Sequence, residues 1–430
     1  MATVAGSHTT ASVRRQYEAL PYPHRDPQEE SQRLLATSCD DLKQLNCYCY
    51  RGRRNFSDGF RVLVAGGGTG DATVFLAEQL RDRGAEIIHL DLSTASIEVA
   101  RQRIRRRGLQ RSVRFVQQSL LDLPTLGLGE FDYINCCGVL HHLADPPEGL
   151  KTLADALKPE GAMMLMVYGQ YARTGVYQMQ ELMRLITDGK DDPREMIDLT
   201  RRTIRSLPDT NWYRRGEKLF GVESGNTDAE IYDLLLHSQD RAYNILQLYQ
   251  FLDTVGLKFV EFAPEFRLCF EPSLVFPDPE IRRQVEALPL PLMHHACELM
   301  WGAVKKHIFW TSPSSDTFCN PRDDESVPEF GFQATAFKVP QAIRDCKESV
   351  WKMEVTFTMG LTLNLGVELN QVTRPFFALV DGRRTMGEII RTIARQMPGT
   401  PPEQIREVCL QSWNTLRAHD LMVMRHQSGG

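Results

Sequence analysis

The chain has 430 residues, of which 42% are hydrophobic and 24% are charged. This composition excludes wholesale disorder, a collagen-like fibre and a coiled-coil rod, and the length predicts two to three domains of about 150 residues each. Lys and Arg number 50 against 55 Asp and Glu, a net charge of −5. No overall basic field therefore exists to attract nucleic acid or anionic lipid.

The cysteines and apolar runs indicate a reducing compartment, which we expect to be the cytoplasm. The 10 cysteines include no CxxC pairs at zinc-finger spacing and do not form a disulfide framework. The longest apolar run, residues 162–167, is far shorter than the ~18 residues of a membrane span. Residues 1–12 lack the apolar core of a secretory signal, whereas the Ser/Thr-rich start followed by Arg14 and Arg15 keeps organelle import open.

The first part of the chain predicts a lid and then an α/β domain. Residues 1–60 are polar and predict a helical lid, with an amphipathic helix over residues 26–45. From there, helical stretches alternate with short apolar runs at residues 61–65, 86–90, 112–116, 131–135 and 162–167. This alternation predicts a doubly wound parallel sheet, whose right-handed crossovers place the carboxyl ends of the strands at one edge, where ligands bind.

A helical insertion and a separate terminal unit follow. Residues 176–250 are mostly helical, and strand candidates at 257–262 and 307–311 bracket a helix around residues 292–304. We expect these strands to complete the sheet. The Ser-, Pro-, Asp- and Asn-rich residues 311–324 predict a linker. The expected parts are an N-terminal lid (1–60), an α/β domain (61–314, with the insertion) and a small α+β unit (331–425).

The strongest motif is a glycine loop, VLVAGGGTGD at residues 62–71, between a strand and a helix. Glycines allow a tight turn and close approach of a ligand to the backbone, and the helix amino terminus adds free N–H groups. A dinucleotide fingerprint, G-x-G-x-x-G from Gly66, requires a glycine where this chain has Asp71. The observed G-x-G-x-G spacing therefore favours a ligand without a pyrophosphate.

An acidic residue follows at the end of the next strand. Asp91 lies 21 residues after Gly70 (91 − 70). A carboxylate there can accept hydrogen bonds from both hydroxyls of a ribose. The alternative is that Asp91 only caps the helix that starts near Thr94, although Ser93 is already a preferred cap.

Further motifs give the chain a resemblance to the class I S-adenosylmethionine (SAM)-dependent methyltransferases. After the glycine loop and its acid come SLLDLP at 119–124, GVLHHL at 138–143 and LKPEG at 157–161. The start, YEALPYP at 17–23, resembles the YE-x-x-PYP opening of a bacterial subgroup. The resemblance implies a Rossmann-like seven-stranded sheet, SAM as cofactor and methyl transfer.

The resemblance also implies a set of cofactor contacts. The glycine loop would face the methionyl part, the end of the next strand would hold the ribose, and later loops would face the adenine and the sulfonium. The implied residues are Ala65, Gly66, Gly68, Gly70, Asp91, Leu92, Ser119, Leu120, Cys136, Gly138 and Tyr22. Many members carry an acid where this chain has Val64, so the methionine ammonium would need backbone carbonyls near Ala65 or Asn135.

Three side chains are candidates for catalysis. His141 and His142 are candidates for a general base, although the family's His-His loops mostly shape the pocket. Tyr17, with Tyr22, would fold over the cofactor, where an aromatic ring attracts the sulfonium. Ordinary packing of an N-terminal helix is the alternative for both tyrosines.

Two other clusters are better explained without a ligand. Seven arginines lie between residues 101 and 114, but Ile97, Ala100 and Ile104 form one apolar face. This pattern predicts outward-facing arginines on a solvated helix, so nucleic acid is not the expected partner. The HHAC run at 294–297 lacks a fourth ligand at a diagnostic spacing, and no metal site is predicted.

The terminal unit bears on the methyl acceptor. Its DGRRT turn at 381–385, with helices before the apolar run at 421–424, resembles the PqqD-like winged-helix domains that bind peptides. Such domains capture peptides by strand addition, so we predict a protein or peptide acceptor. A stabilising or homodimerising addition, a small-molecule acceptor and RNA are the alternatives. For the class, the alternatives are an NAD-linked oxidoreductase and a non-catalytic SAM-binding scaffold or regulator.

Overall fold

The fold is given by a computed structural model that describes residues 14, 17–57, 59–220, 227–237, 239–356 and 362–429. Residues 1–12, on which the predictions about secretion and organelle import largely depend, lie outside the described residues. Within the part of the chain that is described, no helix is both long enough and apolar enough to cross a membrane.

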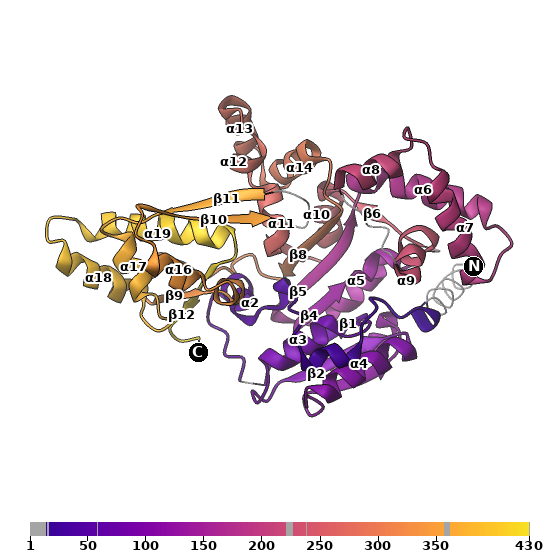
Figure 1. The fold of residues 1–430 in the computed structure, drawn as a ribbon. Helices are drawn as coiled ribbons and strands as arrows, with labels where there is room; N and C mark the ends of the chain where they lie inside the picture. Colours follow the sequence, from indigo (N-terminus) through magenta and orange to yellow (C-terminus); the bar gives the residue numbers. More distant parts are fainter. Residues whose placement is uncertain are drawn as a thin grey trace.

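A Rossmann-like sheet forms the centre of the molecule, as predicted (Figure 1). Its strands run in the order β3-β2-β1-β4-β5-β8-β7, and the short β6 pairs with β5. The central strands β1 and β4 are buried on both faces, as is usual in parallel sheets. The strands are β1 (Arg61–Ala65), β2 (Glu86–Asp91), β3 (Val113–Gln117), β4 (Phe131–Cys137), β5 (Leu157–Gly169), β6 (Ala242–Tyr243), β7 (Lys258–Phe262) and β8 (Lys306–Ser312).

One strand departs from the predicted parallel sheet. β8 runs antiparallel to both β5 and β7. The helix before it, α14 (Leu290–Trp301), ends near the carboxyl edge of the sheet, where Lys306 pairs with Tyr168 at the end of β5. Because β8 begins at that edge, it can only run back along β5. The short β6 was not predicted.

Helices flank the sheet and connect its strands. Those between the parallel strands are α3 (Asp71–Gln79), α4 (Thr94–Arg106), the 3-10 turns η3 (Leu120–Thr125) and η4 (Leu140–His142), and α5 (Pro146–Asp155). Near the last strands lie α10 (Ile245–Asp253), α11 (Pro264–Arg267), η7 (Leu268–Phe270), α12 (Pro272–Val275) and α13 (Pro279–Glu286). The predicted helix around residues 292–304 corresponds to α14.

The predicted amphipathic helix over residues 26–45 is wrong. This segment forms the 3-10 turns η1 (Pro27–Ser31) and η2 (Ser38–Asp40), and only then the helix α2 (Leu42–Cys49), which Asp41 caps. The reason is tertiary. Glu30 binds buried Arg103 of α4. Asp40 binds Tyr133 and Asn135 of β4. These contacts with distant residues are incompatible with one continuous helix.

The insertion forms a small helical layer at one end of the sheet (Figure 1). Its own apolar cluster includes Val176, Met179, Tyr213 and Leu235. Its elements are η5 (Tyr171–Arg173), α6 (Thr174–Ile186), α7 (Pro193–Ser206), α8 (Trp212–Phe220), α9 (Asp228–Ile231) and the π-helix η6 (Tyr232–Leu236). The predicted helical character of residues 176–250 agrees with these elements.

The terminal unit lies at the other end, on the far side of the sheet from the insertion (Figure 1). It contains two antiparallel strand pairs, β9 (Ser326–Phe330) with β12 (Met422–His426) and β10 (Val350–Thr356) with β11 (Thr362–Glu368). β9 starts before the predicted boundary at residue 331. The helices are α15 (Phe332–Ala336), α16 (Val339–Asp345), α17 (Thr373–Leu379), α18 (Met386–Gln396) and α19 (Pro402–Ala418). Its winged-helix character stays a prediction.

A buried ion pair joins the terminal unit to the sheet. Arg267 of α11 donates to the Asp420 carboxylate at 2.9 Å, and both side chains are less than a tenth exposed. The Arg267 guanidinium also lies 4.6 Å from the ring centre of Tyr48 in α2. Removing one partner would leave the other charge buried and uncompensated, which is far costlier than losing a surface pair.

We therefore expect Arg267→Met to lower the free energy of unfolding by about 3–5 kcal/mol, because Asp420 loses its counter-charge. Urea denaturation monitored by circular dichroism measures this. Arg322→Met, which removes a fully exposed pair with Glu407, is the matched control and should leave stability almost unchanged. Equal effects of the two substitutions would contradict the role of the buried pair.

Candidate functional site

A cavity of about 1350 Å³ lies at the carboxyl ends of the central strands. Its floor comes from the glycine loop and from the ends of β2, β4 and β5. The N-terminal segment contributes Tyr17, Tyr22 and Asp40, and the insertion contributes Asp233. This is the edge at which a doubly wound sheet binds its ligands.

The glycine loop has the tight geometry that its sequence predicts. Gly66 and Gly68 have φ values of +70° and +51°, in the left-handed region. A Cβ at Gly66 would lie 2.3 Å from Val139, and one at Gly68 would lie 2.8 Å from the carbonyl oxygen of Tyr22. The loop therefore leaves room for a ligand only because these side chains are absent.

Asp71, the residue that breaks the dinucleotide fingerprint, holds the N-terminal segment. Arg25 donates to both carboxylate oxygens of Asp71, with its closest contact at 2.6 Å. Arg103 of α4 donates to Asp71 and to the carbonyl of Thr69, and it is only 1% exposed. The prediction that the α4 arginines all face solvent is wrong for Arg103, because Glu30 and Asp71 supply two carboxylates beside it.

Asp91 is fixed at the end of β2 with its carboxylate at the cavity. Its Oδ2 accepts from the Gly68 N–H at 2.8 Å, and its Oδ1 accepts from the Ser93 N–H at 2.8 Å. Ser93, not Asp91, caps α4 by accepting from the Ser96 N–H. Burial raises the pKa of Asp91. Each oxygen of Asp91 accepts one N–H bond and keeps a lone pair for a hydrogen bond from a ligand.

A second carboxylate, Asp40, is fully buried and was not predicted from the sequence. It lines the cavity beside Val64, and the amide of Asn135 donates to both its oxygens at 2.8 and 3.0 Å. Tyr133 donates to Oδ1 at 2.7 Å. No local signal marks Asp40, because it lies in a polar segment 95 residues before Asn135.

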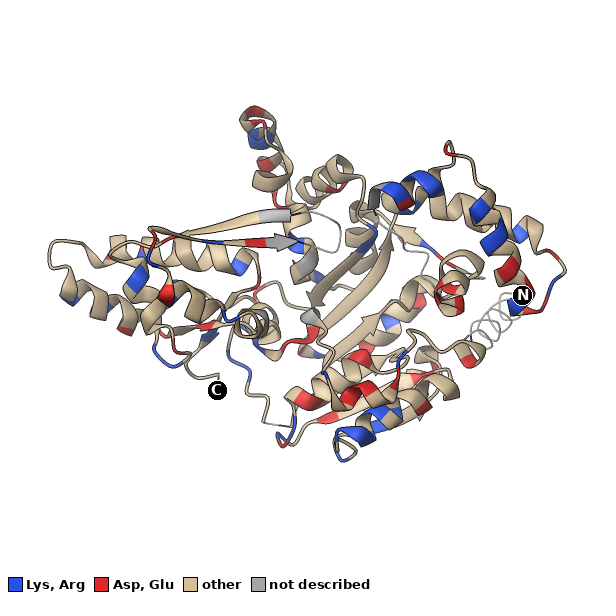
Figure 2. Cartoon of the chain, in the orientation of Figure 1, with Lys and Arg blue, Asp and Glu red and all other residues tan. Residues whose placement is uncertain are grey.

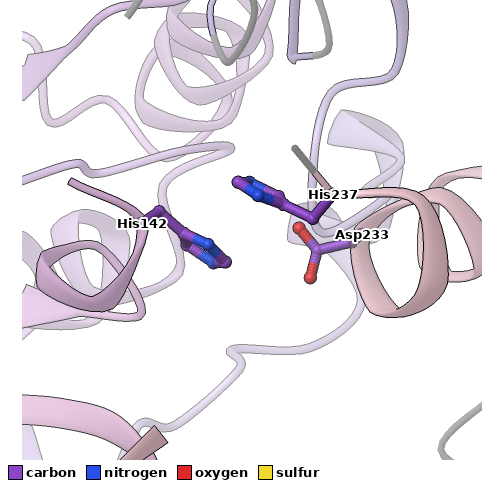
Figure 3. A group of neighbouring side chains, drawn as sticks. All are labelled: His142, Asp233 and His237. Carbon is purple, nitrogen blue, oxygen red and sulfur yellow. The ribbon is translucent and has the colours of Figure 1, made fainter. Parts of the chain in front are cut away.

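A third carboxylate, Asp233 of the π-helix, lies with two histidines at the insertion side of the cavity (Figure 3). Tyr17 donates to Asp233 Oδ1 at 2.8 Å, and Tyr168 donates to Oδ2 at 3.4 Å. Polar atoms of Asp233, His142 and His237 all lie within 4.8 Å of one another. Sequence reasoning missed Asp233 and His237, although π-helices are frequent at functional sites.

The hydrogen bonds fix opposite roles for the two histidines. His142 Nδ1 donates to the carbonyl of Gln239 at 2.9 Å, which leaves Nε2 of the neutral ring as an acceptor. His237 Nδ1 accepts from the Gln239 N–H at 3.1 Å, so its proton is on Nε2. Burial holds the pKa of His237 well below its usual value.

These roles suit proton transfer better than metal binding. Among the described residues, these three alone bring His, Cys, Asp or Glu ligand atoms close enough together to hold a metal ion. However, the two imidazole rings stack at 3.8 Å with an interplanar angle of 26°, so their lone pairs do not converge on one point. His237 would also have to lose the hydrogen bond from Gln239 to offer a lone pair at Nε2.

His141 lies apart from the cavity. It is fully buried, its ring is 3.9 Å from the ring of Tyr168, and it does not line the cavity. Burial holds the pKa of His141 well below its usual value. A buried neutral ring without access to the cavity is suited to packing.

The cavity brings together most of the predicted site residues. Those lining it are Tyr17, Tyr22, Gly66, Gly68, Asp91, Leu92, Ser119, Leu120, Gly138 and His142. The others, which do not line it, are Ala65, Gly70, Cys136 and His141. Cys137 lines the cavity in place of Cys136, because successive side chains of β4 point to opposite faces. The roles of all these residues stay predictions.

Acidic side chains outnumber basic ones around the cavity. The acids are Asp40, Asp71, Asp91, Asp122, Asp145, Glu148, Glu230 and Asp233, against Arg14, Arg25, Arg173 and Lys306. Arg25 and Arg173 are already paired, with Asp71 and Asp240. Figure 2 shows Lys and Arg instead along the outer helices α4, α7 and α8. The cavity therefore suits a cationic ligand.

Part of the domain that holds this site resembles known proteins. Residues 63–163 match the methyltransferase domain family, which supports the predicted methyltransferase class and SAM as its cofactor, whereas the bounds of the α/β domain stay a prediction. An uncharacterized protein of Synechococcus is 36% identical over 217 residues, which are 50% of this chain and 51% of that protein. The tRNA 5-carboxymethoxyuridine methyltransferase of Escherichia coli is 34% identical over 111 residues, 26% of this chain and 41% of that enzyme. This chain thus spans about half or less of these relatives.

A solved structure resembles nearly the whole chain. PKMT2 from Rickettsia typhi aligns with a TM-score of 0.60 and 13% identity, over 91% of this chain and 76% of that one. A second structure of PKMT2, in complex with AdoHcy, aligns with a TM-score of 0.58. At this identity the likeness shows a shared fold, which extends beyond the methyltransferase domain.

Buried His89 beneath the glycine loop predicts a pH dependence of stability. Burial lowers its pKa to about 3, whereas an unfolded chain titrates near ~6.5. Between these values the unfolded state binds a proton that the folded state does not, so stability must fall as the pH falls from about 6.5 towards 3. His89→Gln should reduce the slope of unfolding free energy against pH by up to ~1.4 kcal/mol per unit between pH 4 and 6.

Urea titrations at several pH values measure that slope. His24→Gln, at an exposed histidine, is the control and should leave the slope unchanged. A His89→Gln slope identical to that of the wild type would show that His89 takes up its proton as easily in the folded state.

Proposed function

We propose that this chain is a SAM-dependent methyltransferase that methylates an amine of a protein or peptide. The observation that carries the proposal is that one and the same cavity has Asp91 and the glycine loop at one end and Asp233 and His142 at the other. The first end suits a nucleoside without phosphates, and the second suits a protonated amine. The matched methyltransferase domain supports the class of reaction.

The residues present fit SAM. The glycine loop leaves space that a Cβ would fill, Asp91 offers free lone pairs to a ribose, and Ser119 and Leu120 line the cavity beyond it. Asp71 stands where a dinucleotide fingerprint requires a glycine, which disfavours an NAD-linked enzyme. When bound, SAM supplies a methyl group on a positively charged sulfur.

The acceptor end suits an amine because Asp233 has no counter-charge among the described residues. Asp233 is 6% exposed, and the neutral hydroxyls of Tyr17 and Tyr168 donate hydrogen bonds to it. The neighbouring Arg173 is paired with Asp240 at 2.7 Å. An ammonium group would compensate the buried carboxylate and gain cation–π attraction from the tyrosine rings.

An ammonium must lose a proton before its nitrogen can accept a methyl group. His142 Nε2 is the acceptor for that proton, since Nδ1 is committed to the carbonyl of Gln239. Asp233, within 4.8 Å, would stabilise the imidazolium that forms. The rest of the cavity wall excludes water and aligns the two reactants.

Two features favour a protein or peptide over a small molecule as the acceptor. The insertion and the terminal unit are two additional folded parts on opposite sides of the sheet, which is more chain than a pocket for a metabolite needs (Figure 1). The β10–β11 hairpin pairs with no further strand among the described residues, so its edges are available for strand addition by a peptide.

The first test concerns the cofactor end. Asp91→Ala should weaken binding of S-adenosylhomocysteine roughly tenfold to hundredfold, because it removes a charge-assisted contact. Isothermal titration calorimetry measures this, and Asp122→Ala, at a cavity acid beyond Leu120, serves as a control with a smaller effect. A chain that binds NADH and not S-adenosylhomocysteine would contradict the proposed class.

The second test concerns the proton acceptor. His142→Gln should lower the rate of methylation by a factor of about 10²–10⁴ and remove the acidic limb of the pH–rate profile. His141→Gln, a neighbour that does not line the cavity, should keep that limb. If His142→Gln and the wild type gave the same pH–rate profile, His142 would only shape the pocket.

The third test identifies the acceptor. Tritiated SAM is incubated with cell extract, which is then separated into protein, RNA and small-molecule fractions. We expect label in protein, and a chain truncated after residue 314 should lose that label. Because that truncation also removes contacts with α2 and α11, substitution of alternate β11 edge residues by proline in the full chain is the companion test. Label only in small molecules would support the alternative metabolite acceptor, and no turnover with retained SAM binding would indicate a scaffold.

A further inference from the structure

The N-terminal segment brings a buried carboxylate to the strand ends of the sheet. Asp40 of η2 is fully buried, yet it lines the cavity. Its oxygens accept from the Asn135 amide at 2.8 and 3.0 Å and from the Tyr133 hydroxyl at 2.7 Å. These donors are neutral, and no ion pair reaches Asp40 from the described residues.

The position of Asp40 is opposite to that of Asp91 across the glycine loop. In the sheet order β3-β2-β1-β4, Asp91 ends β2, whereas Asn135 beneath Asp40 belongs to β4. Asn135 pairs in register with Val64 of β1, and both residues line the cavity. A ligand whose ribose lies at Asp91 and whose base lies towards Leu120 would therefore extend its other end to Asp40.

Three elements hold Asp40 in this place. Trp310 of β8 donates to the carbonyl of Cys39 at 3.0 Å, and Gln79 of α3 donates to the carbonyl of Asp40 at 2.9 Å. The next residue, Asp41, caps α2 by accepting from the Lys43 N–H. The carboxylate is thus preorganised.

The electrostatics of this position favour a cationic ligand. A buried carboxylate with only neutral partners is costly, and burial raises the pKa of Asp40. Lys306 also lines the cavity, but no ion pair joins it to Asp40 among the described residues. Val64, next in register to Asn135, contributes no charge, so Asp40 is the acid at this end of the loop.

We propose that Asp40 binds the ammonium group of the amino-acid part of SAM, so that the N-terminal segment supplies the acid that β1 lacks at Val64. This inference rests on the proposed function, because it assigns one end of the same cofactor. It also gives the N-terminal segment a direct role in ligand recognition. A purely structural Asp40, which only anchors η2 to β4, is the alternative.

The test compares two ligands that differ only in this ammonium group. S-adenosylhomocysteine carries it, and its deamino analogue has hydrogen in its place. Calorimetry with the full chain should show that the wild type prefers S-adenosylhomocysteine roughly tenfold to hundredfold. In Asp40→Asn the two ligands should bind within about twofold of each other, because the ammonium has lost its partner.

Two variants serve as matched controls. Asp41→Asn removes an adjacent acid that does not line the cavity, and asparagine still caps the helix, so it should keep the wild-type preference. Asp91→Asn should weaken the binding of both ligands by the same factor and keep the preference for S-adenosylhomocysteine. Equal binding of the two ligands by the wild type, or an equal loss of both in Asp40→Asn, would overturn the assignment.

The outcomes separate this inference from the proposed function. A wild-type chain that binds neither ligand contradicts both. A chain that binds S-adenosylhomocysteine without preference over the deamino analogue contradicts only the role of Asp40. If Asp40→Asn does not fold, Asp40→Ser is a second variant for the same measurement. Equal affinities of the wild type for the two ligands would contradict the proposal without any variant.

Discussion

The cavity depends on one buried charge network that fixes the N-terminal segment over the glycine loop. Arg103, which is 1% exposed, binds Glu30 and Asp71, and Arg25 binds the other side of Asp71. Arg107 also binds Glu30, so Arg103, Glu30 and Asp71 each have two oppositely charged partners in this network. Because this network holds the segment at the strand ends, it also determines where Tyr17, Tyr22 and Asp40 lie.

Three carboxylates then give the cavity its chemical character. Asp91, Asp40 and Asp233 line it from β2, from the N-terminal segment and from the insertion, and none has an ion-pair partner among the described residues. Neutral N–H and O–H groups donate hydrogen bonds to them. Such a cavity can accept hydrogen bonds from the hydroxyl groups of a ligand at one carboxylate and can bind a cationic group at another. This division matches a nucleoside at one end and an amine at the other.

The local sequence pattern was sufficient to predict the central sheet and one end of the candidate site. Short apolar runs separated by amphipathic helices predicted the seven main strands, because burial on both faces of a parallel sheet demands continuous apolar residues. The glycine loop and Asp91 were also predictable, since a turn and a strand end place them next to each other within a single β-α-β unit. The helix over residues 26–45 failed because Glu30 and Asp40 bind partners far along the chain.

The sequence by itself therefore determined the fold class, the glycine loop and Asp91, all of which follow from contacts between neighbouring elements. Only the tertiary structure decided which other acids meet them. Asp40 reaches Asn135 across 95 residues, and Tyr17 reaches Asp233 across 216. The orientation of β8 and the burial of Arg103 were likewise decided there. The physical reason is that these side chains gain their partners only when distant segments pack, and no local periodicity encodes that packing.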